Sequence, residues 1–259
     1  MTMAVTGSLR DKLVARACFG MSCRLTRTTD IAAMLRDAGY DWMFLDLEHG
    51  PLGFDQICQQ ALAGVEAGVT PIVRVADPKP GPIHRVLSNG AMGVIVPHVD
   101  DPETAAGIAR QCRFPPCGDR SVPGLVPQLG YRPISFREAA EQLDPVTLCV
   151  VMIESVRAVE AVDEIAAVEG VDVLFVGASD LTFQLGVPSA YGDPRVAGAM
   201  EKVANAARRH GKVAGFGGVA DAETARRYIG LGMHFILAGN DTTVFMQGAR
   251  ARLATLRGE

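Results

Sequence analysis

Val150-Val-Met-Ile-Glu154-Ser155 opens the stretch of sequence that decides the fold, and this stretch continues to Leu181. An apolar run at 148–153 ends in the carboxylate of Glu154. An amphipathic segment at 156–168 follows, with valine or isoleucine at every third position, and a second apolar run at 171–176 ends in Gly177-Ala-Ser-Asp180. This order predicts a strand, a helix and a second strand, joined by the right-handed crossover that connects neighbouring parallel strands.

Glu154 and Asp180 would then both lie just beyond the C-terminal ends of adjacent strands. In parallel α/β folds this edge is where ligands bind. Two carboxylates that meet there suit a hard divalent cation. The alternative is that Glu154 only begins the next helix and that Asp180 is a turn residue, and the pattern alone leaves both interpretations open.

Eight apolar runs predict strands, and helical patterns lie between most of them. The runs lie at 16–21, 42–47, 70–75, 93–97, 148–153, 171–176, 212–216 and 233–238, and the helical patterns at 28–38, 54–67, 80–88, 102–112, 134–142, 156–168, 194–210, 221–230 and 241–256. This alternation in 259 residues predicts a (β/α)8 barrel, formed as a single domain over 1–259. A doubly wound open sheet is the alternative, but no Gly-x-Gly-x-x-Gly follows the first run.

Composition and charge exclude several classes of partner. The apolar content of 48% and charged content of 21% are ordinary for a globular enzyme, and the net charge of −4 gives no basic field for nucleic acid or for an anionic membrane. No apolar signal region begins the chain, and no run reaches the length that spans a membrane. We therefore expect a cytoplasmic enzyme that acts on a small molecule.

Two further strand ends carry polar residues. After the second run come Asp46, Glu48 and His49, and a histidine three residues past an aspartate can form an Asp-His pair in which the carboxylate fixes the imidazole tautomer. The third run ends in Arg74, which is unusual in an apolar strand unless the arginine has an anionic partner. An ion pair with Asp46 or Glu48 would also explain this arginine.

One connection, at 114–133, is too long for a simple crossover. Long loops without regular structure in compact domains are usually functional. Because this loop comes after the fourth run, we expect it to lie over the mouth of the barrel. Arg120, in this loop, would either contact the substrate or lock the loop in place, and the sequence leaves the two roles equally open.

The motif Ile153-Glu154-Ser155, followed after the helical segment by Gly170-Val-Asp-Val-Leu-Phe-Val-Gly177-Ala-Ser-Asp180-Leu181, resembles the HpcH/HpaI aldolase family of metal-dependent class II enzymes. The Asp46-x-Glu48-His49 element and Gly118-Asp119-Arg120 extend the resemblance along the chain. It implies reversible cleavage of a 4-hydroxy-2-oxo acid to pyruvate and an aldehyde through a pyruvate enolate. It also implies a homo-oligomer, expected as a hexamer, with its sites near subunit contacts.

The same resemblance assigns roles to individual residues. Glu154 and Asp180 would bind a divalent ion (Mg²⁺, Mn²⁺ or Co²⁺), with Glu48 orienting water near it. Arg74 would stabilise the enolate oxygen, and His49, assisted by Asp46, would be the general acid/base. The pyruvate carboxylate would rest on the backbone at Ser179 and Asp180. No lysine stands at a strand end, which argues against Schiff-base chemistry.

The sequence departs from the family pattern at three positions. Ala178 stands where the family has proline, Met152 where many relatives have glutamine, and Ser88 where many have aspartate. The last two changes put the hydrogen bonding of the keto acid and the choice of aldehyde in question. Two rival functions remain: a citrate-lyase-β-like acyl-CoA lyase, and a barrel that binds a keto acid without turning it over.

A glycine-rich turn, Gly215-Phe-Gly-Gly218, follows the seventh run and has the composition of a phosphate-binding turn. Asp221 comes after it, and an aspartate here is also a good N-cap for the next helix. Helix capping is the simpler explanation.

Overall fold

Eight parallel strands close into a barrel in the computed structural model, which describes residues 8–258. The strands are β1 (Cys18–Ser22), β2 (Trp42–Asp46), β3 (Thr70–Arg74), β4 (Gly93–Val96), β5 (Leu148–Ile153), β6 (Val173–Gly177), β7 (Val213–Gly217) and β8 (Met233–Asn240). Each strand pairs with its neighbour in the chain, and β8 pairs with β1 to close the ring. The (β/α)8 fold predicted from the eight apolar runs is confirmed.

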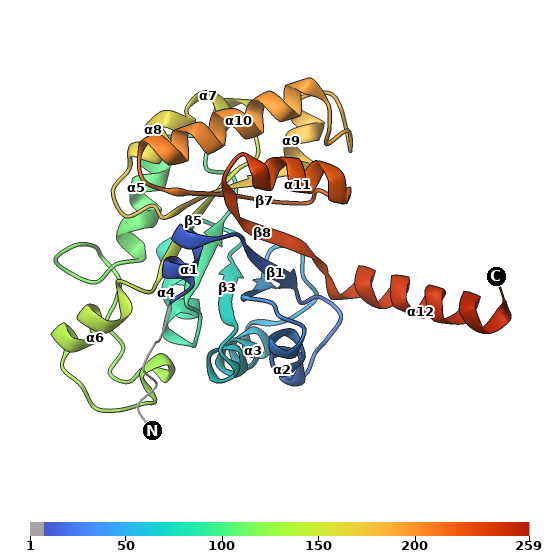
Figure 1. Cartoon of the computed structure of the whole chain (residues 1–259). Coiled ribbons are helices and arrows are strands. Elements are labelled where there is room, and N and C mark those ends of the chain that lie inside the picture. Colours follow the sequence, from blue (N-terminus) through green and yellow to red (C-terminus); the bar gives the residue numbers. More distant parts are fainter. Residues whose placement is uncertain (1–7, 259) are drawn as a thin grey trace.

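Helices surround this barrel on the outside (Figure 1). They are α1 (Leu9–Ala15), α2 (Asp30–Asp37), α3 (Phe54–Ala67), α4 (Pro80–Ser88), α5 (Pro102–Gln111), α6 (Phe136–Leu143), α7 (Val156–Glu160), α8 (Val162–Ala167), α9 (Ala178–Gln184), α10 (Pro194–Arg209), α11 (Ala222–Gly230) and α12 (Asp241–Arg257), with a short 3₁₀ turn, η1 (Pro127–Leu129). The sequence did not predict α1 or η1. The segment expected as one helix at 156–168 is broken at Ala161 into α7 and α8, so that expectation is corrected.

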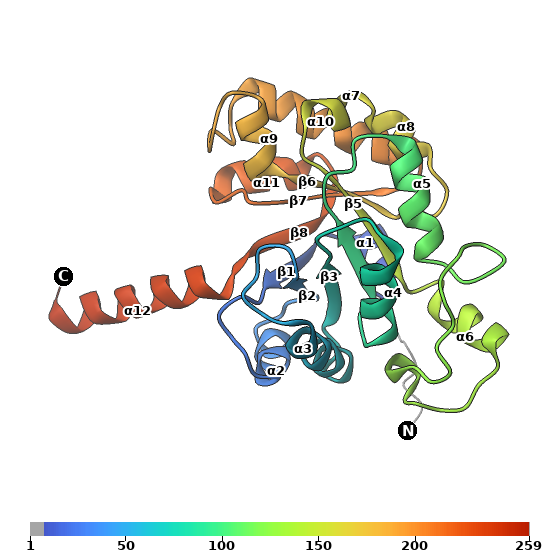
Figure 2. The same ribbon diagram turned by 180° about the vertical axis from the view of Figure 1, so that it is seen from behind.

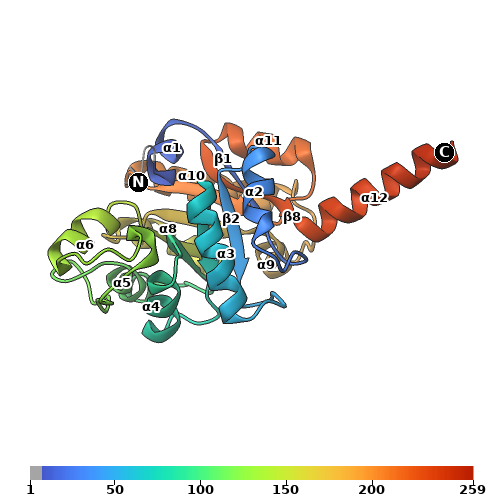
Figure 3. The ribbon, with the colours of Figure 1, turned by 90° about the horizontal axis from the view of Figure 1, so that it is seen from below.

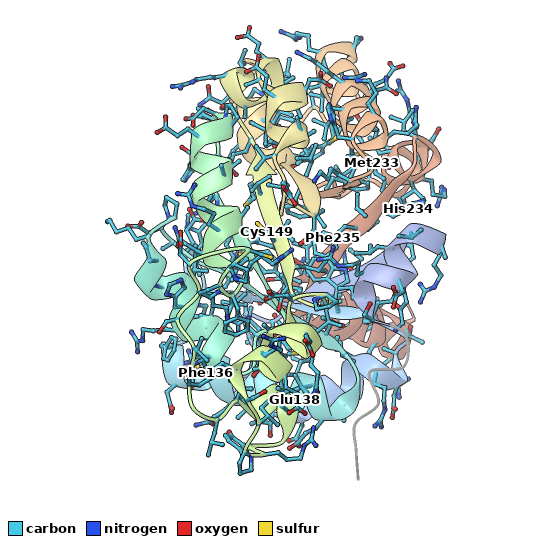
Figure 4. All side chains as sticks on the ribbon, turned by 90° about the vertical axis from the view of Figure 1, so that its left-hand side faces the viewer. Phe136, Glu138, Cys149, Met233, His234 and Phe235 are labelled. Carbon is cyan, nitrogen blue, oxygen red and sulfur yellow. The ribbon has the colours of Figure 1, made fainter. Side chains whose placement is uncertain are left out.

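Alternate residues of each strand point into the barrel, because side chains in a strand have a period of two. Trp42 and Phe44 of β2, Met152 of β5, and Phe175 and Phe235 of β6 and β8 belong to one buried inner cluster. Trp42 stacks on Phe235 with ring centroids 4.0 Å apart. Figure 4 shows Phe235 among the side chains that fill this interior, with α6, marked by Phe136 and Glu138, on the outer side.

Gly20 is required by this packing. A Cβ at position 20 would come within 2.2 Å of the Trp42 ring, so any side chain there would displace the indole. At the N-terminal end of the barrel, Leu9 and Leu13 of α1 belong to the same inner cluster and close the bottom. The interior is therefore a packed core rather than a pore, so a ligand cannot bind inside the barrel.

The long loop 114–133 does not cover the mouth, and our expectation on this point is wrong. The loop follows α5 rather than β4 directly, so the chain has already returned to the N-terminal side of the barrel. Arg120 donates to the carbonyl of Leu87 at 2.9 Å, and Gln128 donates to the carbonyls of Leu87 and Ala91, which precede β4. The loop is thus anchored beside the start of β4.

Helix α12 extends away from the barrel rather than packing along it, as two opposite views show (Figures 1 and 2). The view from below gives the same arrangement (Figure 3). Asp241, at its first position, is its one buried residue among those described. None of the helices over residues 8–258 combines the length and the apolar content needed to span a membrane.

Candidate active site

Charged residues meet at the C-terminal ends of the strands, on the side chains that follow the inward-facing positions. Because Phe44, Ile72 and Met152 face the interior, the next alternate residues, Asp46, Arg74 and Glu154, emerge above the core at the mouth. Asp46 and Arg74 are register partners on β2 and β3. The polar residues predicted at these strand ends therefore share one rim.

Arg74 holds two carboxylates. Its Nε and Nη2 donate to Asp46 Oδ1 and Oδ2 at 2.9 and 2.7 Å, and its Nη1 lies 2.9 Å from Glu48 Oε2. The guanidinium carbon lies 5.2 Å from the centre of the Phe44 ring. Burial alone would raise the pKa of Asp46, but the hydrogen bonds from Arg74 outweigh it and hold that pKa below its usual value. Arg74 is thus fixed in orientation with its charge intact.

The expected Asp46–His49 side-chain pair is absent, and this is a correction. Asp46 Oδ1 accepts the backbone amides of Glu48 and His49 at 3.0 and 3.3 Å as well as Arg74 Nε, and Oδ2 accepts Arg74 Nη2, so the carboxylate is directed at Arg74 and the loop backbone and not at the imidazole. The carboxylate that lies near the His49 ring is Glu48, 3.7 Å from Nε2. The imidazole is 62% exposed and is free to turn toward the mouth.

Glu154 is buried, and His98 holds one of its oxygens. Glu154 Oε1 accepts the backbone amide of His98 at 2.7 Å and lies 2.8 Å from His98 Nδ1. The other ring nitrogen of His98 lies 3.3 Å from Glu48 Oε1. His98 adopts a φ of 57°, which is uncommon for a residue other than glycine. This backbone conformation lets its amide and its ring meet the same carboxylate.

A divalent cation fits beside Glu154. Burial raises the pKa of Glu154, and the negative charges of Asp180 and Glu48 add to this effect, so a cation would relieve the repulsion among these groups. A Cβ at Gly177 would come within 2.7 Å of Glu154 Oε2, so the glycine leaves space next to that oxygen. Across residues 8–258 no group of three or more His, Cys, Asp or Glu side chains is arranged around a metal position. An ion held by Glu154 and Asp180 would take its other ligands from water and substrate.

A cavity of about 490 Å³ opens at this mouth. Phe44, Met152 and Phe175 line it together with Arg74 and His49. Ser179 and Asp180, exposed in the first turn of α9, also line it, as do residues of the loops after β1 and β7, the end of β8 and the first turns of α12. Met152, which stands where relatives have glutamine, therefore gives the cavity an apolar wall.

Gly218 belongs to the same cavity, and the conformation of the chain there requires glycine. Its φ is +90°, and a Cβ would come within 2.8 Å of Ser179 Oγ. Gly217, the last residue of β7, also lines the cavity, whereas Gly215 lies within β7 and does not. Asp221 caps α11 by accepting the amide of Thr224 at 2.7 Å, as the capping interpretation predicted.

A larger cavity, of about 930 Å³, lies at the other end of the barrel, between α1, α5 and the starts of β5, β6 and β7. The charged residues that line it are mostly paired: Asp172 contacts Arg10 and Arg113 at 2.7 Å each. None of the strand-end residues predicted from the sequence lines it. We place the active site at the smaller cavity because the carboxylates, the arginine and the histidine converge there.

Arg120 lies outside the mouth cavity. Its side chain is 1% exposed, stacks over the Phe114 ring at 4.3 Å and bonds the carbonyl of Leu87. Burial lowers the pKa of Arg120 to about 10. Of the two roles that the sequence left open, locking the loop is the one that matches this position.

Three residues at the mouth escaped the sequence analysis in whole or in part. His98 was given no role in the sequence analysis, because its contacts with two carboxylates depend on an unusual φ that a sequence does not display. Arg24 and Asp241 were not singled out. Asp241 accepts the backbone amides of Arg24, Leu25 and Thr26 at 2.8–2.9 Å, a contact that joins the start of α12, after β8, to the loop after β1.

Comparison with known proteins adds to this geometry. A sequence model of the HpcH/HpaI aldolase/citrate lyase family matches residues 25–248. The 4-hydroxy-4-methyl-2-oxoglutarate aldolase tasA of Hapsidospora irregularis is 38% identical over 90% of this chain and 88% of its own length. The hydroxypyruvate/pyruvate aldolase of Pseudomonas aeruginosa is 34% identical over 88% of this chain and 84% of its own. The crystal structure of the HpcH/HpaI aldolase from Desulfitobacterium hafniense DCB-2 has a TM-score of 0.90 and 30% identity, covering 97% of both chains.

Proposed function

This chain belongs to the HpcH/HpaI aldolase/citrate lyase family, and from this premise we propose that a divalent-metal-dependent aldol cleavage takes place at the mouth cavity. The enzyme is a carbon–carbon lyase of the aldolase class, which releases pyruvate from a 4-hydroxy-2-oxo acid, as the names of its relatives support. The observation that carries the proposal is that Arg74 and Asp180 line the mouth cavity and that Glu154 is close enough to interact electrostatically with both.

Glu154 and Asp180 are the residues that would hold Mg²⁺, Mn²⁺ or Co²⁺. Two carboxylates at a wet, open site suit a hard ion that keeps several water or substrate ligands. When bound, the ion would supply positive charge next to the keto oxygen of the substrate. His98 contacts Glu154 with one ring nitrogen and Glu48 with the other, and it would keep the Glu154 carboxylate in one orientation.

Arg74 would stabilise the negative charge that develops on the enolate oxygen. Its guanidinium is already oriented by Asp46 and Glu48, so no reorganisation is needed when the charge appears. The pyruvate carboxylate would lie at the first turn of α9, against Ser179 and Asp180. Gly218 leaves that surface open.

His49 would take the proton of the 4-hydroxyl group as the C3–C4 bond breaks. Its ring is exposed at the mouth, and its backbone is fixed by Asp46. Asp46 would therefore assist His49 by positioning the loop and Arg74 rather than by contact with the imidazole. Glu48 is the carboxylate near enough to bias the tautomer of the ring.

A panel of 4-hydroxy-2-oxo acids, assayed for pyruvate release with and without added metal, tests the proposal. We expect release from at least one member and loss of release after chelation with EDTA. Cleavage of an acyl-CoA thioester without any aldolase activity would favour an acyl-CoA lyase. Binding of 2-oxo acids with no turnover of any substrate would favour a non-catalytic barrel.

We also propose that the protein assembles as a homo-oligomer, expected as a hexamer. Helix α12 extends from the barrel (Figure 2). Its exposed apolar side chains are Val244, Phe245, Met246, Leu253 and Leu256. A helix with so many exposed apolar side chains is stabilised when a second surface covers them. A second copy of this chain is the partner that the family relationship supports. A cytoplasmic location and a single domain over 1–259 remain predictions from the sequence.

A further inference from the structure

Arg24 is a cation of the mouth cavity that has no anionic partner. It lies in the loop after β1 and lines the cavity. Its Nη2 donates to the backbone carbonyl of His49 at 2.9 Å, and within residues 8–258 no carboxylate lies within salt-bridge distance of its guanidinium. Arg24 is exposed, so its charge faces solvent rather than a carboxylate and is accessible to an anionic ligand.

The other charged residues that line the cavity are already committed. Arg74 and Asp46 neutralise each other in a two-point ion pair. Asp180 lies beside Glu154, where the proposed cation would bind. An anionic group of the substrate that reaches the β1 side of the mouth would therefore meet Arg24 as its one available cation among the described residues.

The backbone that carries Arg24 is fixed before any ligand binds. The carboxylate of Asp241 accepts the amides of Arg24, Leu25 and Thr26 at 2.8–2.9 Å. Burial alone would raise the pKa of Asp241, but these amides outweigh it and hold that pKa below its usual value, so the anchor is ionised at neutral pH. A fixed loop reduces the entropy that Arg24 loses on binding a ligand.

Position in the barrel assigns Arg24 to one half of the substrate. Strand β1 lies between β8 and β2, across the ring from β5 and β6, which carry Glu154 and Asp180. In the proposed function the pyruvate half of the substrate lies near β5 and β6. Arg24 donates to the backbone of His49, the proposed base, and therefore lies near the 4-hydroxyl group.

We propose that Arg24 binds a carboxylate attached to C4 of the substrate, so that the preferred carbonyl product is a small 2-oxo acid rather than a neutral aldehyde. The inference rests on the proposed aldolase function and names its substrate class. In cleavage the C3–C4 bond breaks, its electron pair passes to C3 as the pyruvate enolate, and the 4-hydroxyl proton passes to the base. C4 becomes the keto or aldehyde carbon of the second product, which retains the carboxylate that Arg24 binds.

The synthetic direction gives a matched pair of acceptors. Glyoxylate and acetaldehyde differ by a carboxylate in place of a methyl group, and each is condensed with pyruvate while kcat/KM is measured. We expect Arg24→Gln to lower the glyoxylate-to-acetaldehyde ratio of kcat/KM by about 10- to 100-fold, the scale of one charged hydrogen bond. Arg24→Lys should recover part of the ratio, because it keeps the charge but not the planar fork.

Arg27→Gln is the matched control, since Arg27 lies in the same loop, is exposed and does not line the cavity. It should keep the wild-type ratio. An unchanged ratio in Arg24→Gln, or an equal fall in both variants, would overturn the proposal. So would an equal loss of both acceptors together with loss of deuterium exchange at the pyruvate methyl, because Arg24 would then serve the pyruvate half.

The deuterium-exchange assay also distinguishes failure of this inference from failure of the proposed aldolase function. A wild-type enzyme that neither exchanges the methyl protons nor condenses either acceptor would refute the aldolase mechanism, and with it the role of Arg24. If the wild-type enzyme exchanges the methyl protons and condenses both acceptors, but Arg24→Gln leaves the preference for glyoxylate unchanged, only the role of Arg24 in acceptor binding is refuted.

Discussion

Arg74 and Asp46, register partners on neighbouring strands, form a two-point ion pair with N–O distances of 2.9 and 2.7 Å. The pair stands directly above the packed interior, with Phe44 beneath the guanidinium. Because strand register places Asp46 directly beside Arg74, the ion pair holds the guanidinium of Arg74 in one orientation at the rim.

Arg74→Lys keeps the charge but cannot reproduce the bidentate contact with Asp46. If Arg74 stabilises the enolate, kcat should fall by about 10²-fold or more, the scale for one lost oxyanion donor. Steady-state kinetics of pyruvate release measures this. A rise in KM with unchanged kcat would show instead that Arg74 only binds the substrate.

Glu154→Ala and Asp180→Ala should each reduce pyruvate release to the rate without enzyme while the circular dichroism spectrum stays unchanged. Each variant should also bind Mn²⁺ more weakly in a direct titration, a measurement that does not depend on turnover. Exhaustive chelation should silence the wild-type enzyme. Full activity after that treatment would remove the metal from the mechanism.

His49→Ala should separate cleavage from enolate chemistry. Loss of the base at the 4-hydroxyl should lower aldol cleavage by about 10²-fold or more, the usual effect of a positioned acid/base. Decarboxylation of oxaloacetate needs no such base and should survive. Equal loss of both activities would assign His49 to support of the metal site, and unchanged cleavage would exclude it from the mechanism.

Asp241→Asn tests the anchor of the Arg24 loop through its pH dependence. The folded-state pKa of Asp241 is below its usual value, so its stabilisation is present above pH about 4 and is lost as the pH falls through the folded-state value. At pH 7 the variant should be less stable by about 2 kcal/mol, and the difference should shrink in acid. Denaturant unfolding from pH 7 to pH 3 measures both. A gap that does not narrow would contradict the electrostatic account.

Phe245→Glu and Leu253→Glu place charges on the exposed apolar side chains of α12. Light scattering should find an oligomer for the wild type and smaller species for both variants. Arg252→Gln, on the same helix, should leave the assembly unchanged. A wild-type chain that is monomeric at micromolar concentration would contradict the proposed role of α12.

The sequence predicted the barrel because its strands are buried on both faces and read as apolar runs, and because strand ends in parallel folds share one edge. For the same reason it located Asp46, Arg74, Glu154 and Asp180. The sequence did not predict which partner each carboxylate binds. Asp46 binds Arg74 instead of the His49 ring, because strand register places Asp46 beside Arg74. It misplaced the 114–133 loop because α5 intervenes between β4 and that loop, which returns the chain to the opposite end.

Contacts between distant parts of the chain were the least accessible to sequence analysis. The three amides held by Asp241 lie more than two hundred positions away in the chain, although the two segments become neighbours when β8 pairs with β1. The bond from His98 to Glu154 likewise depends on a left-handed backbone at His98. Neither feature leaves a periodic pattern.

The closed ring of strands also makes the enzyme suitable for protein engineering. The groups expected to generate the enolate follow β3, β5 and β6, whereas Arg24 follows β1 and is anchored from β8. A mutant library confined to loop 23–27 would therefore vary the choice of acceptor while the donor chemistry is inherited unchanged. Selection from such a library could yield catalysts for new carbon–carbon bonds with pyruvate as the common building block.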